Sequence, residues 1–252
     1  MKLPKNIECY VENMRCKKDK EGMSSASVYE FFDESKTYYL KIEKRNEEVI
    51  REHEMYKWLK SKLPLPKVIC EYTEGDIEYL LIEKADGIML ESDVYRNNPE
   101  LLVKLAADGI RTLQSIAINS CPYDSSIEYK LRCAKRYIEN EGVYKVDRNE
   151  YTIGMETTQD VYNYLIANKP IEEKVFTHGD YCFNNYFASG DKISSFIDLG
   201  RAGVGDKYQD IALCVRELWD FDKYYTQLLF KHLGIIPNYE KIKYYILLDE
   251  LF

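Results

Sequence analysis

Apolar and polar residues alternate along much of the first ninety residues, as they do in half-buried β-strands. The runs with this pattern, rich in β-branched and aromatic residues, are 27–32, 36–42, 68–72 and 78–83. Between the second and third runs, residues 47–60 change to helical spacing, with Glu52 on the apolar face of the helix. The pattern therefore predicts a small antiparallel sheet with one helix inserted.

After the short segment Ala85-Asp86-Gly87 the periodicity becomes mainly helical. Helices are predicted over 99–118, 126–141, 158–168, 207–218, 220–233 and 238–250. Residues 175–198 interrupt this series with strands and loops. We predict an α+β protein of two lobes, a smaller sheet lobe over 1–84 and a larger, mainly helical lobe over 85–252.

Composition narrows the class of protein. Lys and Arg number 35 against 43 Asp and Glu, so the net charge of −8 disfavours broad attraction to nucleic acid. No apolar run exceeds five residues, which predicts no membrane association. Seven cysteines without a CxxC pair indicate free thiols in a reduced, cytoplasmic chain, and three scattered histidines exclude a histidine-rich metal centre. Residues 91–252 carry −6 of the net charge, which makes this half the better candidate for a cationic ligand.

The residues best suited to chemistry lie in Phe176–Asn185 and in Phe196–Gly200. Asp180 and Asn185 are five residues apart in a predicted loop, and Asp198 ends the next apolar strand. A carboxylate at 180 can orient a hydroxyl and accept its proton, while Asn185 and Asp198 supply the oxygen ligands that Mg²⁺ prefers. His178 is better explained as a structural histidine that bonds the backbone of this loop. The spacing favours Asn185 over its neighbour Asn184 and predicts phosphoryl transfer.

The first lobe offers a charged pair for the same chemistry. Lys41 lies within a predicted strand, and Glu52 lies on the apolar face of the next helix. Burying a lone carboxylate there would cost free energy, which pairing with Lys41 removes, and the ammonium could then contact nucleotide phosphates. Either residue taken singly is more commonly a surface charge, but a strand lysine followed by a helix glutamate, both upstream of the Asp180 motif, favours the pair.

Together these residues resemble the aminoglycoside phosphotransferases, and most of all the type III 3′-phosphotransferases of the kanamycin kinase kind. The segments that carry the resemblance are EGMS (21–24), YLK (39–41), ADG (85–87), VFTHGD (175–180), FIDLGR (196–201), DKYQDIALCVR (206–216) and KIKYYILLDELF (241–252). The resemblance implies a protein-kinase-like fold that uses ATP and Mg²⁺ to phosphorylate a hydroxyl, the 3′ one, of an aminoglycoside. Such a reaction would confer antibiotic resistance, and no protein partner is expected.

The resemblance also assigns roles to residues. It makes Asp180 the catalytic Asp, Asn185 and Asp198 the metal ligands, and Asp210 a brace for the loop. Nucleotide contacts are implied for Met23, Ser24, Tyr39, Lys41, Glu52, Ile82, Ala85 and Ile197. Drug contacts are implied for Asp147, Glu150, Arg201, Asp249, Glu250 and Phe252. Because aminoglycosides are polycations, acids in the 139–160 segment and at the C-terminus suit this role, although a solvated helix face explains the 139–160 acids equally well.

Two residues depart from the family pattern. Phe183 stands where relatives carry an acid near the drug, and Tyr181 replaces an aliphatic residue, so both are expected beside the substrate. Two alternatives stay open: a kinase of the same fold acting on choline or another alcohol, and a catalytically silent protein that binds nucleotide or drug.

Overall fold

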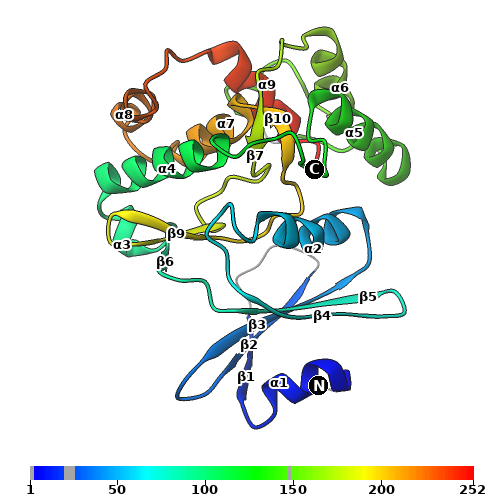
Figure 1. Ribbon diagram of the computed structural model, residues 1–252. Coiled ribbons are helices and arrows are strands. Elements are labelled where there is room, and N and C mark those ends of the chain that lie inside the picture. Colours follow the sequence, from blue (N-terminus) through cyan, green and yellow to red (C-terminus); the bar gives the residue numbers. More distant parts are fainter. Residues whose placement is uncertain (1–2, 20–25, 147–148) are drawn as a thin grey trace.

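A β-rich lobe and a mainly helical lobe meet along one face in the computed structural model, which describes residues 3–19, 26–146 and 149–252 (Figure 1). The β-rich lobe holds one antiparallel sheet in the order β1-β2-β3-β5-β4. Its strands are β1 (Arg15–Lys18), β2 (Ser27–Phe32), β3 (Thr37–Lys44), β4 (Val68–Glu74) and β5 (Ile77–Glu83). Helix α1 (Lys5–Val11) packs at the outer end of this lobe, where the N-terminus lies.

Helix α2 (Glu47–Leu59) connects β3 to β4 and lies between the sheet and the helical lobe (Figure 1). Its first turn is capped by the Asn46 side chain, which accepts a hydrogen bond from the Val49 amide at 2.9 Å. The predicted apolar face is correct, since Val49, Glu52, Met55 and Leu59 are all buried. The helix therefore presents Glu52 toward β3 from a fixed position.

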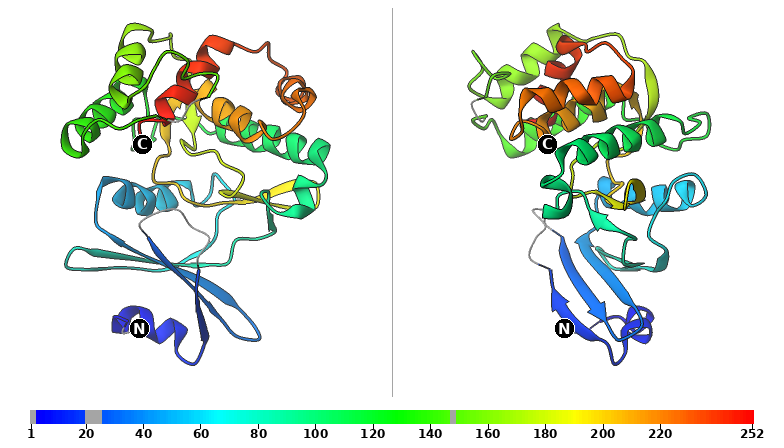
Figure 2. Two further views of the ribbon diagram at one scale, coloured as in Figure 1. Left: turned by 180° about the vertical axis from the view of Figure 1, so that it is seen from behind. Right: turned by 90° about the vertical axis from the view of Figure 1, so that its left-hand side faces the viewer.

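The larger lobe is built from helices around small sheets. The helices are α3 (Asp93–Arg96), α4 (Pro99–Gln114), α5 (Ile127–Glu141), α6 (Thr158–Ala167), α7 (Tyr208–Glu217), α8 (Lys223–Leu233) and α9 (Tyr239–Asp249). Strands β6 (Ile88–Met89), β8 (Tyr186–Ser189) and β9 (Lys192–Phe196) form one sheet, and β7 (Lys174–Thr177) pairs with β10 (Gly203–Asp206). The C-terminus lies on the side of this lobe that faces the β-rich lobe (Figure 2).

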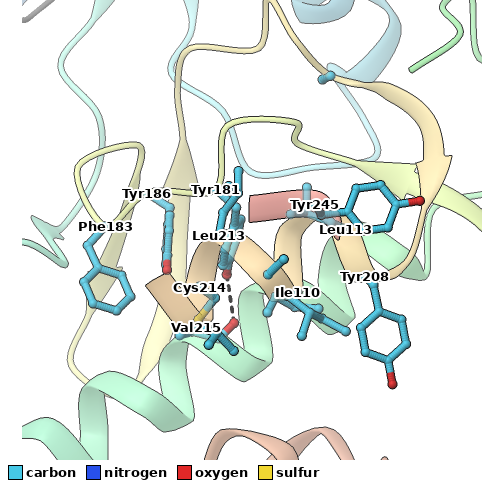
Figure 3. Packing of buried hydrophobic residues seen from close by; sticks show 14 of the residues in the cluster. Ile110, Leu113, Tyr181, Phe183, Tyr186, Tyr208, Leu213, Cys214, Val215 and Tyr245 are labelled. Carbon is cyan, nitrogen blue, oxygen red and sulfur yellow. Dashed lines mark hydrogen bonds between the residues drawn. The ribbon is translucent and has the colours of Figure 1, made fainter. Parts of the chain in front are cut away.

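Aromatic side chains fill the core beneath the loop that follows β7 (Figure 3). Tyr181 stacks on Tyr186 with ring centroids 4.4 Å apart, and its hydroxyl donates to the Ala106 carbonyl on α4. Gly109 lies against that hydroxyl, where a Cβ atom would approach it to 2.2 Å. Tyr181 and Phe183 are both fully buried, so the expectation that they lie beside the substrate is wrong. Their bulk supports the loop from within the core, because the apolar rings gain more by burial than by facing a wet site.

The periodicity predicts most elements within a few residues. The predicted strands and helices all occur, and the α+β, two-lobed class is confirmed. The elements not predicted from the sequence are the short helices α1 and α3 and the short strands β1, β6 and β10. Among the described residues, no helix is long and apolar enough to cross a membrane.

Candidate active site

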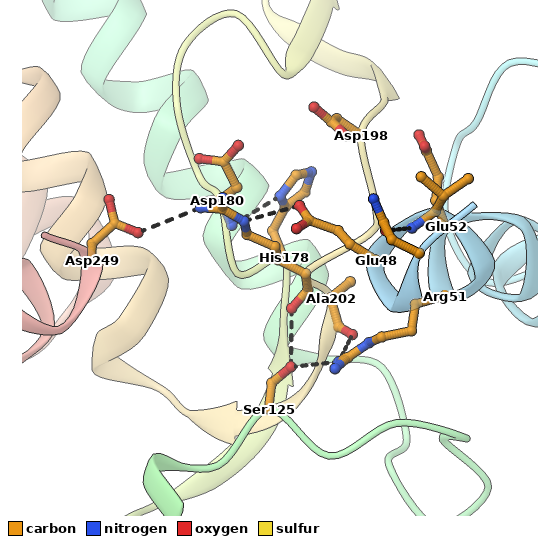
Figure 4. A network of polar contacts seen from close by, with 12 residues as sticks. Glu48, Arg51, Glu52, Ser125, His178, Asp180, Asp198, Ala202 and Asp249 are labelled. Carbon is orange, nitrogen blue, oxygen red and sulfur yellow. Dashed lines mark hydrogen bonds and ion pairs between the residues drawn. The ribbon is translucent and has the colours of Figure 1, made fainter. Parts of the chain in front are cut away.

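Lys41 stands at the centre of a charged cluster between the lobes. Its Nζ lies 2.9 Å from Glu52, 3.1 Å from Glu43 and 3.2 Å from Asp198. Burial alone would lower the pKa of Lys41, but the three carboxylates, Glu52 foremost, raise it well above its ordinary value. The ammonium therefore stays charged, as a group that binds phosphate must. Figure 4 shows two members of this cluster, Glu52 and Asp198, with the polar network around them.

The loop from His178 to Asn185 is fixed through its backbone. Asp210, on α7, accepts hydrogen bonds from the amides of His178 at 2.8 Å and Gly179 at 3.0 Å, so the bracing contact expected of Asp210 is present. Gly179 has φ of +86° and lies so close to the Arg201 carbonyl that a Cβ atom would approach it to 2.2 Å. His178 Nε2 bonds the Ile197 carbonyl at 2.9 Å, which makes it the structural histidine that the sequence predicts.

Asp180 projects from this loop with both carboxylate oxygens engaged. Asn185 Nδ2 donates to one oxygen at 3.0 Å, and the Cys182 thiol donates to the other at 3.2 Å. Burial would raise the pKa of Asp180, but His178, Arg201 and these two hydrogen bonds hold it below its ordinary value. Asp180 is therefore ionised at neutral pH and able to accept a hydrogen bond from a hydroxyl.

Asn185 and Asp198 could hold a divalent cation. Asn185 is buried and uses its Nδ2 on Asp180, so its carbonyl oxygen is the atom available for a metal, whereas the neighbouring Asn184 is exposed. Asp198 has φ of +57°, a conformation that side-chain-bearing residues rarely adopt and that turns up at functional positions. Two oxygen ligands suit Mg²⁺, which keeps several of its waters in proteins.

A chain of hydrogen bonds and ion pairs, which begins at the Cys182 thiol, connects Asp180 to the C-terminal helix. Asp249 lies 2.6 Å from Arg216 and 3.9 Å from Arg201, and Arg201 also pairs with Glu48 of α2 at 3.0 Å. The Arg216 guanidinium in turn reaches the Cys182 sulfur at 3.9 Å. Asp249 and Arg201 therefore lie on the side of the catalytic candidate, but each is already paired with a protein group of opposite charge.

The remaining candidates for drug contact lie around the chain end. Glu250 accepts a hydrogen bond from Asn149 at 3.4 Å, and Glu150 is exposed next to it. The Phe252 ring lies 5.8 Å from the Arg201 guanidinium. Asp147 lies outside the described residues. The structure thus brings Glu150 and Glu250 to one place through Asn149, although the two are 100 residues apart in the chain.

The family follows from comparison with known proteins. The model of the phosphotransferase enzyme family matches residues 16–245. An aminoglycoside 3′-phosphotransferase from Enterococcus faecalis is 40% identical and aligns with 100% of this chain and 99% of its own. The chain belongs to the phosphotransferase enzyme family. A solved aminoglycoside-3′-phosphotransferase of type VIII has a TM-score of 0.82 at 25% identity, with 94% of each chain covered.

A more distant member of the phosphotransferase family shows the same fold with ligands. The structure of APH(3″)-Id from Streptomyces rimosus with ADP and streptomycin has a TM-score of 0.78 at 19% identity, covering 98% of this chain and 96% of that one. At this identity the likeness concerns the fold alone.

The nucleotide candidates of this phosphotransferase chain lie on both lobes. Tyr39 and Ile82 are register partners on β3 and β5, Ala85 is buried just beyond β5, and Ile197 precedes Asp198. Met23 and Ser24 lie outside the described residues.

Four residues of this site escaped the sequence reasoning: Glu43, Lys130, Cys182 and Arg216. Glu43 could have been found, since residues two apart on a strand share a face and Lys41 was already a candidate. Lys130 is a buried lysine on α5, and its contact with Phe252 joins segments 122 residues apart. No local pattern marks such contacts.

Proposed function

We propose that this protein is an ATP-dependent aminoglycoside 3′-phosphotransferase. The observation that carries the proposal is the position of the Lys41 ammonium, 2.9 Å from Glu52 and 3.2 Å from Asp198. That contact joins the strand lysine of one lobe to the metal-ligand candidate of the other, as phosphoryl transfer between the lobes requires. The identity to enzymes named aminoglycoside 3′-phosphotransferase supports both the substrate class and the 3′ position.

On the nucleotide side, Lys41 binds the phosphates and Glu52 keeps its ammonium in place. Met23, Ser24, Tyr39, Ile82, Ala85 and Ile197 are proposed to surround the remainder of ATP. Asn185 and Asp198 would hold Mg²⁺, which when bound neutralises charge on the phosphates. These assignments divide the nucleotide site between the two lobes.

On the acceptor side, Asp180 orients the drug hydroxyl and takes its proton. Its two hydrogen bonds fix the carboxylate for this role, and its lowered pKa keeps it ionised. Positioning of the reacting groups supplies most of the rate enhancement in phosphoryl transfer.

Carboxylates recognise the cationic drug in this proposal. The residues proposed to contact it are Asp147, Glu150, Arg201, Asp249, Glu250 and Phe252. Because Asp249 is held by two arginines, the exposed Glu150 is the carboxylate better placed to meet an ammonium group.

The test is incubation of purified protein with ATP, Mg²⁺ and kanamycin, neomycin or choline, followed by product mass and NMR of the phosphorylated position. We expect a mass gain of one phosphate on the aminoglycosides, at the 3′ hydroxyl. Absence of any phosphorylated aminoglycoside would refute the proposal, and a phosphorylated choline would favour the alternative kinase.

Asp180→Ala tests the role of the catalytic candidate. Turnover should be abolished while ATP binding, measured by calorimetry, is retained. Asp191→Ala, in the exposed hairpin after β8, is the matched control and should keep full activity. Loss of ATP binding in Asp180→Ala would contradict the role given to Asp180.

A further inference from the structure

Two aromatic side chains from distant segments stack beside the acceptor side of the site. The rings of Tyr151 and Trp219 lie 5.5 Å apart with an interplanar angle of 10°. Tyr151 belongs to the loop before α6, and Trp219 follows the end of α7. Trp219 remains 40% exposed despite this contact. Tyr151 therefore orients the indole ring of Trp219, while much of the indole surface stays open to solvent.

A hydrogen bond of Tyr151 itself, and one of Glu217 two residues before Trp219, connect the pair to residues near the proposed drug site. On the α7 side, Glu217 accepts a hydrogen bond at 3.1 Å from the Phe183 amide, in the loop that carries Asp180. On the other side, Asn149 accepts a hydrogen bond from the Tyr151 amide at 2.8 Å and donates one to Glu250 at 3.4 Å. The aromatic pair is thus anchored to the Asp180 loop and to the C-terminal helix together.

The surroundings of the pair are acidic. Burial raises the pKa of Tyr151, and the adjacent Glu150 carboxylate raises it further. Glu250 accepts a hydrogen bond from Asn149, and the exposed Asp220, which follows Trp219, pairs with Arg96 at 3.6 Å. An aromatic face flanked by carboxylates attracts a cation through the ring quadrupole and the charges together.

We propose that the stacked pair Tyr151–Trp219 is a substrate subsite, in which the exposed face of Trp219 packs against an amino-sugar ring of the drug. The proposal rests on the aminoglycoside 3′-phosphotransferase function. The C–H face of the sugar would cover the indole, and its ammonium groups would face Glu150 and Glu250. Such a contact acts on binding of the whole substrate, so it affects KM far more than kcat.

The two tryptophans of the chain allow a direct test. Trp58 lies on α2, its indole nitrogen donating to Ser120, and belongs to no part of the proposed site. In Trp58→Phe, Trp219 is the only indole. We expect kanamycin, added without nucleotide, to change its fluorescence saturably, while the variant keeps the activity of the unaltered protein. An unchanged signal in a Trp58→Phe enzyme that still phosphorylates kanamycin would overturn the proposal.

The kinetics of Trp219→Leu provide an independent test of the subsite. The KM for kanamycin should rise about tenfold, which corresponds to about 1.4 kcal/mol, with little change in kcat or in the KM for ATP. An unchanged KM for kanamycin overturns the subsite. Choline is the comparison ligand, and a fluorescence response to choline but not to kanamycin would also overturn it. If no aminoglycoside is phosphorylated, the proposed function fails, and the titration still decides whether Trp219 contacts the drug.

Discussion

The Lys41 ammonium contacts carboxylates from both lobes. Its removal leaves Glu43, Glu52 and Asp198 without this cation. Burial raises the pKa of Glu52 to about 7 even beside the ammonium. In Lys41→Met that pKa rises further above the ordinary 4.5, so the folded state binds a proton that the unfolded state lacks. The free energy of unfolding should therefore fall as pH rises from 5 to 8, with a deficit of about 3 kcal/mol at pH 8.

Urea unfolding at the two pH values measures this deficit. Lys44→Met, at the exposed end of the same strand, is the control and should lower stability by less than about 1 kcal/mol at either pH. A pH-independent deficit in Lys41→Met would mean that Glu52 is not the carboxylate left unpaired.

Lys130 presents the opposite situation, a buried ammonium that lacks an ion pair among the described residues. Burial lowers its pKa to about 8, against the pull of Asp249. Below pH 8 the folded protein holds this charge at a cost that the unfolded chain does not have. Lys130→Met should therefore raise the free energy of unfolding by about 2 kcal/mol at pH 7, and the gain should shrink as pH rises from 8 to 10.5.

Thermal unfolding at pH 7 and 10 checks this expectation. Lys135→Met lies on the same helix with an exposed side chain and should change stability little at either pH. Destabilisation by Lys130→Met at pH 7 would show that the ammonium has a favourable partner in the folded protein.

At the scale of elements, the stability of helix α2 should affect the proposed nucleotide site, because this helix carries Glu52. Asn46→Ala removes the cap of its first turn, which should cost about 1 kcal/mol of stability. Because Glu52 lies on the same helix, the KM for ATP should also rise severalfold. Asp222→Ala, which removes the cap of α8, should cost similar stability and leave the KM for ATP unchanged. If the KM for ATP is the same in both variants, the cap of α2 does not affect the nucleotide site, and the prediction is wrong.

The elements could be predicted from the sequence because their periodicity is local. The apolar face of α2 predicted that Glu52 is buried, and the strand before it located Lys41. Tyr181 and Phe183 show where this reasoning ends. Their neighbours in the chain face the site, but burial against Tyr186 and α4 decides their direction, and that depends on distant residues. The nearness of Asn149 to Glu250 is likewise a property of the tertiary fold.

Across the whole molecule, Arg51 ties α2 to the helical lobe. Its guanidinium donates to the Ser125 hydroxyl and the Ala202 carbonyl, each at 3.0 Å, and lies 4.7 Å from the ring centres of both Tyr123 and Tyr129. Arg51→Met should lower stability by about 3 kcal/mol, because these buried acceptors lose their donor. The β-rich lobe should also unfold at lower urea than the helical lobe.

Trp58 fluorescence, recorded in a Trp219→Phe background so that the second indole does not contribute, and far-UV circular dichroism are followed through the same urea series to test whether the lobes separate. Coincident transitions in Arg51→Met would show that other contacts suffice to couple the lobes. Arg132→Met, an exposed arginine on α5, is the matched control and should unfold in one transition.

The positive φ of Asp198 has a consequence for how this residue is retained over generations. Its positive φ suits glycine better than aspartate, so Asp198→Gly relieves strain of about 1 kcal/mol, but it also removes the ion pair with Lys41 and a carboxylate that the proposed reaction needs. A single base change converts an aspartate codon into a glycine codon. In a population without the antibiotic, selection for the proposed reaction is absent, so we expect exposure to the drug to be what preserves the strained aspartate.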